Sequence, residues 1–234
     1  MTAIKVLSAG AVEGMVKAIG ADFEKATGHR LDLNFGTAGA LRDRLKGGEA
    51  ADFVIVPAAI AEAMDKAGAF VPGSRTDLGR TVTGVAVREG SPLPDISTPE
   101  AFKQALLDAA TVSFTDPKAG GSSGNNFIGL LDKLGIADAV HKKAVLGNRG
   151  FDVVTLVAAG KAEIGTTFIS EILIVPGAQL VGPLPAALQF VNTYTAAIPV
   201  GSASRDVAAA FLDALTDPAS RGRWTAAGLE PAFP

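Results

Sequence analysis

The sequence predicts an α/β protein built from two doubly wound α/β lobes. Two observations support this fold class. Along the first 67 residues, three short apolar segments each end in a small-residue turn and lead into a helical pattern. Strand–helix units in succession form parallel sheets with right-handed crossovers. The same order restarts near residue 112, and a second lobe accounts for the restart.

The first unit combines a strand at residues 4–8 with a helix that starts at Val12 and ends at Gly28. A glycine in this place is a common helix terminator. The helix is indicated by apolar residues at three- and four-residue spacing, which share one helical face. These residues are Val12, Met15, Val16, Ile19 and Phe23.

The next two units complete the first lobe. Residues 31–35 alternate as a half-buried strand does, residues 36–39 form a small-residue turn, and a helix follows at 40–45. Residues 53–56 are continuously apolar, which is typical of a strand covered on both faces, and residues 58–67 form the helix after it.

The rest of the chain, which holds the second lobe and the return to the first, shows a similar succession. Strands are expected at 81–87, 112–114, 164–167 and 190–198, and a loop rich in glycine and serine at 116–124. Helical spacing appears at 101–107, 127–134 and 153–159, with a short helical segment at 168–173 and two terminal helices at 207–215 and 219–227. Three prolines mark irregular connections: Pro176, Pro183 and Pro185.

The composition limits the classes of partner. Of the 234 residues, 48% are hydrophobic, enough for one large core or two medium ones. The formal net charge of −3 gives no long-range attraction toward nucleic acid, so we expect no nucleic-acid partner. Cysteine is absent, and His29 and His141 have no partner at metal-ligand spacing. We therefore expect no metal and no cofactor.

Three loops are candidates for an anion site. Residues 8–11, 36–39 and 120–126 follow predicted strands and open helices with small residues. Ligands of open parallel sheets bind at the carboxyl ends of strands, where helix N-termini present backbone N–H groups. The alternative is that these residues only cap helices. The predicted contacts are Gly10, Ala11, Thr37, Gly39, Ser122, Ser123 and Asn125.

Other side chains could add to this site. Arg149, followed by Gly150 just before a predicted helix, could hold a carboxylate with its guanidinium, or could be a solvated surface residue. Glu13 and Ser123 are the candidates for catalysis, but Glu13 could merely offset the helix dipole. Neither a G-x-S-x-G elbow nor a phosphate-binding G-x-x-x-x-G-K loop is present, so a hydrolase triad and nucleotide binding are disfavoured.

The loops give the chain a family resemblance. It resembles the type II periplasmic solute-binding proteins, most of all the molybdate-binding branch, to which aconitate isomerase is also similar. The resemblance rests on four stretches, residues 4–29, 33–57, 113–124 and 156–168, which read IKVLSAGAVEGMVKAIGADFEKATGH, LNFGTAGALRDRLKGGEAADFVIVP, SFTDPKAGGSSG and LVAAGKAEIGTTF.

The resemblance implies a specific domain organisation. Two hinge strands, near 82–87 and 193–198, would join lobe I (1–81 and 196–234) to lobe II (82–195). An anion would lie in the cleft between the lobes, and hinge closure would follow binding.

The chain departs from the molybdate pattern at three hydroxyl groups. Ala11 stands where that branch has a serine, Thr37 to Gly39 where it has another, and Phe168 where it has a cleft tyrosine. Each unmet partner of a dehydrated oxyanion costs about 1–3 kcal/mol. We therefore expect an organic carboxylate rather than molybdate, with Phe168 also at the ligand.

Two functional classes stay open. The first is a solute-binding protein for a small anion, and the second is a cytoplasmic isomerase of a small unsaturated di- or tricarboxylate on the same fold. The absence of an export signal favours the isomerase, because an importer's receptor has no use in the cytoplasm. The absence of a convincing acid/base pair favours the binding protein, which is the interpretation preferred here.

The location follows from the N-terminus and the hydropathy. No apolar run reaches the roughly 18 residues that cross a bilayer, so no membrane insertion is expected. A strand begins almost at Met1, without the basic and apolar pattern of a signal peptide. The expected location is cytoplasmic for the chain as written, or periplasmic if a leader was removed. In the latter case the expected partner is an ABC importer.

Overall fold

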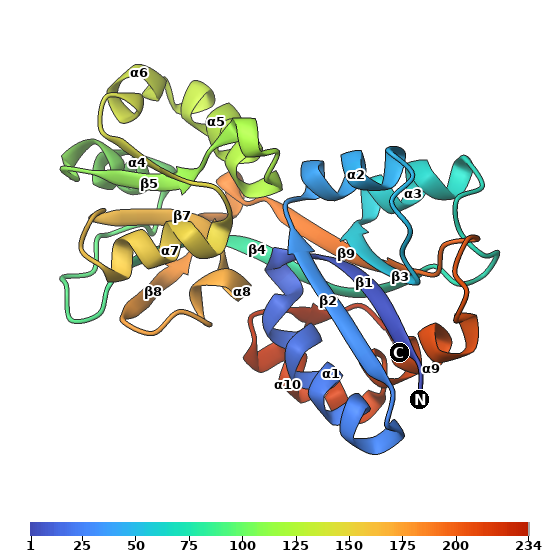
Figure 1. The fold of residues 1–234 in the computed structure, drawn as a ribbon. Helices are drawn as coiled ribbons and strands as arrows, with labels where there is room; N and C mark the ends of the chain where they lie inside the picture. The colour runs from blue at the N-terminus through green and yellow to red at the C-terminus, as the bar shows by residue number, and fades with distance from the viewer. Residues whose placement is uncertain (234) are drawn as a thin grey trace. The chain divides into compact units, whose positions relative to one another are not determined.

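The computed structural model describes residues 1–233 and divides into two compact units. Unit 1 comprises Met1–Arg80 and the chain from Asn192 onward, and unit 2 comprises Thr81–Val191. The chain enters unit 2 within strand β4 (Thr76–Arg88) and leaves it at the start of β9 (Val191–Ala197). Both units contain a sheet and helices (Figure 1), which confirms the predicted α/β class.

The sheet of unit 1 is parallel at its centre. Strands β1 (Ala3–Ala9), β2 (Arg30–Gly36) and β3 (Phe53–Pro57) are parallel in the order β2-β1-β3, and β9 pairs antiparallel with β3. The short β10 (Glu230–Pro231) pairs with the first part of β4. All five residues of β3 are buried, as the continuous apolar run predicted.

Helices of unit 1 cover both faces of this sheet (Figure 1). A 3₁₀ turn (Gly10–Val12) leads into α1 (Glu13–Thr27), which ends at Gly28 with φ of 73°, the left-handed conformation that favours glycine. Phe211 contacts both Phe23 and Phe53 with ring centroids 5.3 Å apart. The other helices are α2 (Ala38–Lys46), α3 (Ala58–Lys66), α9 (Arg205–Leu215) and α10 (Arg221–Ala226).

The sheet of unit 2 is also parallel at its centre, with antiparallel strands beside it. Strands β5 (Val112–Thr115), β6 (Ala144–Gly147) and β7 (Ile164–Phe168) are parallel in the order β6-β5-β7. β4 pairs antiparallel with β7, and β8 (Ala178–Pro183) pairs antiparallel with β4. The helices are α4 (Pro99–Asp108), α5 (Ser122–Leu134), α6 (Ala137–His141), α7 (Gly150–Ala158) and α8 (Ile169–Ile172).

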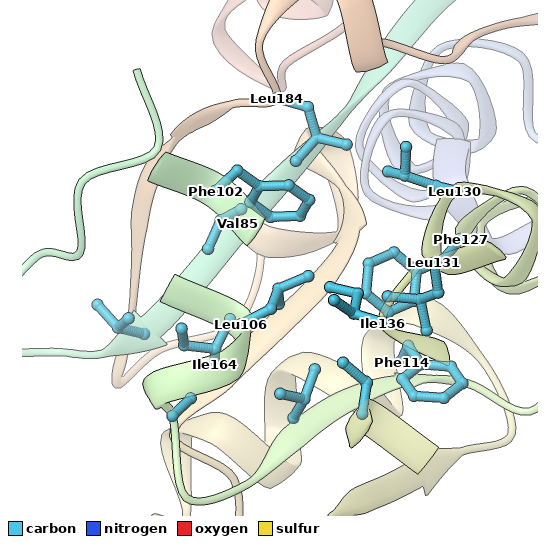
Figure 2. Close-up of a cluster of buried hydrophobic side chains, with 14 residues drawn as sticks. Val85, Phe102, Leu106, Phe114, Phe127, Leu130, Leu131, Ile136, Ile164 and Leu184 are labelled. Carbon is cyan, nitrogen blue, oxygen red and sulfur yellow. The ribbon is translucent and has the colours of Figure 1, made fainter. Parts of the chain in front are cut away.

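The main core of unit 2 lies between its sheet and helices α4 and α5. Figure 2 shows Phe102 and Leu106 of α4 pointing toward the side chains of α5 and of the strands. Phe114 of β5 and Phe127 of α5 pack with ring centroids 5.1 Å apart. On the other face, Ala86, Val154 and Ile172 form a smaller buried cluster with α7 and α8.

The two ends of unit 2 are joined at Thr83. Its backbone N–H donates to the carbonyl of Phe190 at 3.2 Å and to Oε1 of Gln189 at 2.9 Å. Its carbonyl accepts from the side-chain amide of Gln189 at 3.1 Å and from the backbone of Leu184 at 3.0 Å. The strand that enters the unit is thus fixed to the segment that leaves it.

Several elements differ from the predicted ones. Helix α5 begins at Ser122, whereas the prediction placed its start at 127 because its first turn consists of residues of low helix propensity. β4 begins at Thr76 rather than at 81. β8 was predicted as an irregular connection, but Pro183 is its last residue, where a missing N–H does not interrupt the ladder. β6, α6 and β10 were not predicted.

Within residues 1–233, no helix combines the length and the apolar composition that crossing a membrane requires.

Candidate functional site

The predicted ligand residues fall into two groups, one in each unit. Both groups lie where parallel strands end and helices begin. In unit 1, Ala9 at the end of β1 pairs with Gly36 at the end of β2. The loops that follow these strands therefore lie at the same edge of the sheet, as the topology predicted.

In unit 1 the loops offer backbone groups more than side chains. Gly10 opens the 3₁₀ turn that precedes α1, and Ala11 is buried. Thr37 caps α2, because its Oγ1 accepts a hydrogen bond from the backbone N–H of Ala40 at 3.2 Å. Gly39 lies in the first turn of the same helix. The structure thus brings Gly10, Ala11, Thr37 and Gly39 to one edge of the sheet. The side chain of Thr37 caps a helix, which was the alternative to ligand binding considered for these loops.

Glu13 is paired with a cation. Its Oε1 lies 2.5 Å from Nζ of Lys17, one turn further along α1. The Lys17 ammonium also lies over the ring of Phe35, 5.4 Å from its centroid, close to the end of β2. Sequence analysis missed Lys17, because only the fold brings the start of α1 beside the end of β2.

In unit 2 the glycine- and serine-rich loop forms the start of α5. Gly121 is the residue before the helix, and Ser122 and Ser123 are its first two residues. Gly124 packs so tightly on β5 that a Cβ there would lie 2.2 Å from the carbonyl oxygen of Thr115. Ser123 is buried, whereas the side chain of Asn125 is on the exposed side of the helix. The loop therefore positions Ser123 by close backbone packing.

A chain of buried polar side chains runs from Ser123 into the unit. Oγ of Ser123 lies 3.3 Å from Oγ1 of Thr115 and 3.3 Å from Oγ1 of Thr167. Thr167 in turn donates to Oε2 of Glu171 at 2.6 Å. All four residues are at most 6% exposed. Thr115, Thr167 and Glu171 were not predicted, since no local pattern distinguishes them from ordinary strand and helix residues.

Helix α7 begins against this carboxylate. Gly150 is its first residue, and a Cβ on Gly150 would lie 1.9 Å from Oε2 of Glu171. The positive end of the helix dipole thus faces a carboxylate that belongs to the protein. Arg149 precedes the helix. Its backbone N–H donates to Oδ2 of Asp152 at 3.0 Å, and its guanidinium lies 3.6 Å from the same carboxylate and over the ring of Phe151.

Phe168 lies at the end of β7 and is 2% exposed. Its ring stacks on Phe190, with centroids 6.0 Å apart and planes at 30°. At position 168, where the resemblance predicted a ligand contact, the ring is therefore packed in an apolar pair.

The remaining charged groups are engaged elsewhere. Arg42 pairs with Asp43 at 2.8 Å, and Arg44 pairs with Glu49. The side-chain hydrogen bonds from Arg44 and then Lys5 lower the pKa of Glu49 from 4.5 to about 2. In the part of the chain that the structure describes, no group of three histidine, cysteine or carboxylate side chains is placed to hold a metal.

Known proteins resemble the chain over most or nearly all of its length. A family model described as bacterial extracellular solute-binding protein matches residues 4–230. Aconitate isomerase of Pseudomonas sp. is 32% identical over 99% of this chain and 88% of its own length. The molybdate-binding protein ModA of Azotobacter vinelandii is 28% identical over 72% of this chain and 66% of its own length.

Solved structures agree in fold. The periplasmic molybdate-binding protein of Azotobacter vinelandii superposes with a TM-score of 0.76 at 20% identity, covering 97% of this chain and 98% of that one. The sulfate-binding protein SubI of Mycobacterium tuberculosis H37Rv gives 0.75 at 17% identity, covering 100% and 88%. At these identities the likeness concerns the fold alone. Together the comparisons confirm the resemblance predicted from the sequence.

Proposed function

Because the chain belongs to the bacterial extracellular solute-binding protein family, we propose that it captures a small organic anion through one or more carboxylates. The supporting observation is the supply of donors at the strand ends. In each unit helices begin at these ends, α2 and the turn before α1 in unit 1 and α5 in unit 2, so backbone N–H groups and helix dipoles are available to an anion bound at either edge. Ser123 and Lys17 add a hydroxyl and an ammonium group at these edges.

The same edges are poorly suited to molybdate. A tetrahedral oxyanion that leaves water needs donors around all of its oxygens. Ala11 has no hydroxyl, Thr37 uses its hydroxyl oxygen to cap α2, and Phe168 packs against Phe190. A planar carboxylate needs fewer donors, and backbone N–H groups with one cation or hydroxyl satisfy it.

Calorimetric titration tests this proposal. The ligands are tricarballylate, which is a saturated tricarboxylate, cis-aconitate, molybdate and sulfate. We expect heat of binding from the two tricarboxylates and none from molybdate or sulfate at the same concentration. Strong binding of molybdate without binding of either tricarboxylate would overturn the proposal.

A second candidate function is isomerisation of a small unsaturated di- or tricarboxylate on the same fold. The buried carboxyl group of Glu171, connected through Thr167 to Ser123, favours this candidate. The similarity to aconitate isomerase extends over nearly the whole chain and supports it further. Glu13 is a weaker candidate for a base, because the ammonium of Lys17 already binds its carboxylate.

A further inference from the structure

We propose that Glu171 is the catalytic base of this protein and carries a proton between two carbons of a bound unsaturated carboxylate. The inference rests on the second candidate function and specifies its chemistry. No resemblance or sequence pattern pointed to this residue. It follows from the position of one buried carboxyl group in unit 2.

The burial of Glu171 is the first observation. Only 6% of the residue is exposed, although it lies on α8, a helix of four residues directly after β7. A buried carboxylate is costly unless other groups stabilise it, and glutamate is rarely buried without such groups. Here Thr167 donates to Oε2 at 2.6 Å. The fold therefore holds an ionisable oxygen in a fixed position at the end of β7.

The connection to Ser123 is the second observation. A hydroxyl group carries one hydrogen, so Thr167 can donate to only one of Glu171 and Ser123 at a time. The contact with the carboxylate is the shorter, at 2.6 Å against 3.3 Å. Glu171 is thus linked through one hydroxyl to the first turn of α5, where the anion is proposed to bind. Ser123 and Thr167 are positioning residues in this scheme.

The packing of Gly150 is the third observation. A Cβ at this position would lie 1.9 Å from Oε2 of Glu171 and 2.3 Å from Oγ1 of Thr167. Only glycine leaves the space in which the carboxyl group lies at the start of α7. In addition, Oγ of Ser170, the residue before Glu171, is buried without a hydrogen-bond partner within residues 1–233. A ligand oxygen would supply the missing partner.

The chemistry needs one base and no redox step. In an unsaturated tricarboxylate such as aconitate, the base takes a proton from the methylene carbon beside the double bond. The C–H bond breaks, its electron pair spreads over the three allylic carbons and the adjacent carboxylates, and an O–H bond forms on Glu171. The same proton, or one exchanged with solvent, then adds to the other end of the allylic system, and the double bond has moved. One carboxylate can perform both transfers because the acceptor and donor are the same group.

The structural alternative is that the Glu171 carboxylate only packs against the N-terminus of α7 and stabilises the fold there. A glutamine keeps an oxygen that accepts from Thr167, so Glu171→Gln retains that contact and removes the proton acceptor. If Glu171 is structural, the variant loses stability at most. If it is the base, the variant still binds carboxylates but no longer transfers protons.

The test measures proton transfer and binding separately. Each protein is incubated with cis-aconitate in deuterated water, and proton NMR follows both the isomer ratio and deuterium incorporation. Calorimetry with tricarballylate, which lacks the double bond, reports binding alone. The matched control is Glu163→Gln, because Glu163 is an exposed glutamate of the same unit that accepts a backbone hydrogen bond from Ala110 at 2.6 Å.

We expect Glu171→Gln to lower the rate of deuterium incorporation by about 100-fold or more, in the range of general-base contributions. Its tricarballylate affinity and that of Glu163→Gln should stay within about twofold of the wild type. Glu171→Asp should recover part of the rate. Thr167→Val should lower kcat with little change in KM, because it displaces the carboxylate without removing it.

The outcomes separate this inference from the proposed binding function. If the wild type binds tricarballylate but neither isomerises cis-aconitate nor exchanges its protons, the inference is wrong and the binding proposal stands. Exchange by Glu171→Gln at the wild-type rate has the same consequence. If the wild type binds no carboxylate, both proposals fail.

Discussion

Gly124 lies against the carbonyl of Thr115 so closely that a Cβ would stand 2.2 Å from the oxygen, less than any relaxed contact allows. The obstacle is backbone at the end of β5, which cannot rotate away as a side chain can. Helix α5 therefore holds its first turn, with Ser123, at a distance from the sheet that only glycine permits. The two residues couple the fold of unit 2 to the position of a proposed ligand group.

Gly124→Ala should consequently destabilise the protein by about 2 kcal/mol or more, because overpacked sites must shift their backbone. Urea unfolding measures the free energy. Gly129→Ala is the matched control, since position 129 is exposed on the same helix with nothing within 4 Å of its Cβ. That change should be neutral or stabilise by about 1 kcal/mol through helix propensity. Equal effects of the two substitutions would refute the packing argument.

Ser123→Ala should weaken the binding of tricarballylate by roughly tenfold, the value of one hydrogen bond to a charged group. The hydroxyl lies within hydrogen-bonding distance of Thr115 and Thr167 and is therefore held in place. Calorimetry compares this variant with Ser122→Ala, which changes the neighbouring, less buried serine. We expect the control to bind as the wild type does. A larger loss from Ser122→Ala would place the ligand elsewhere on the loop.

Lys17→Gln should lower the affinity for tricarboxylates by about tenfold and make the remaining binding less sensitive to salt. Lys17 carries its charge at the strand ends of unit 1, with Glu13 and Phe35 fixing the ammonium. Lys66→Gln removes an equivalent ion pair, with Glu62 at 2.6 Å, from the far end of α3 and serves as the control. Binding isotherms of both variants are measured at two salt concentrations. Equal losses of affinity in Lys17→Gln and Lys66→Gln would show that only the net charge matters.

The ion pairs of Glu49 predict a pH dependence of stability. Arg44 and Lys5 lower its pKa from 4.5 to about 2 in the folded protein. A lowered folded pKa stabilises the fold above the unfolded value, and this contribution disappears as the pH falls from about 4.5 to about 2. The wild type should therefore have a higher urea midpoint than Glu49→Gln at pH 7.

The difference between those two midpoints should shrink through this pH window. Arg44→Gln, which removes the largest cause of the shift, should reduce the pH dependence in the same direction. A difference in midpoint that stays constant from pH 7 down to pH 3 would contradict the assignment.

The sequence was sufficient where a local rule decides the structure. Gly28 ends α1 in the left-handed conformation because a helix terminus selects glycine within one turn. The run at 53–56 became a fully buried strand because its apolar side chains cover both faces. The loops at Gly10 and Thr37 share an edge because consecutive parallel strands must end on the same side.

The sequence was insufficient where two distant segments meet. The role proposed for Glu171 depends on its contact with Gly150 at the start of α7. No spacing along the chain indicates that contact, so the sequence could not predict it. Lys17 shows the same limitation, since Phe35 is 18 positions away. The start of α5 was placed too late because serine, glycine and asparagine are poor helix formers. Packing on Thr115 overrides that preference.

The hydrogen bond from Thr83 to Phe190 bears on how such proteins diversify. It joins the beginning and the end of one continuous stretch of chain, so the chain enters and leaves unit 2 at neighbouring points. Recombination at two sites would exchange this stretch between relatives without new linkers. The proposed ligand group Ser123 and the proposed base Glu171 would then be exchanged in one event, while unit 1 stays intact.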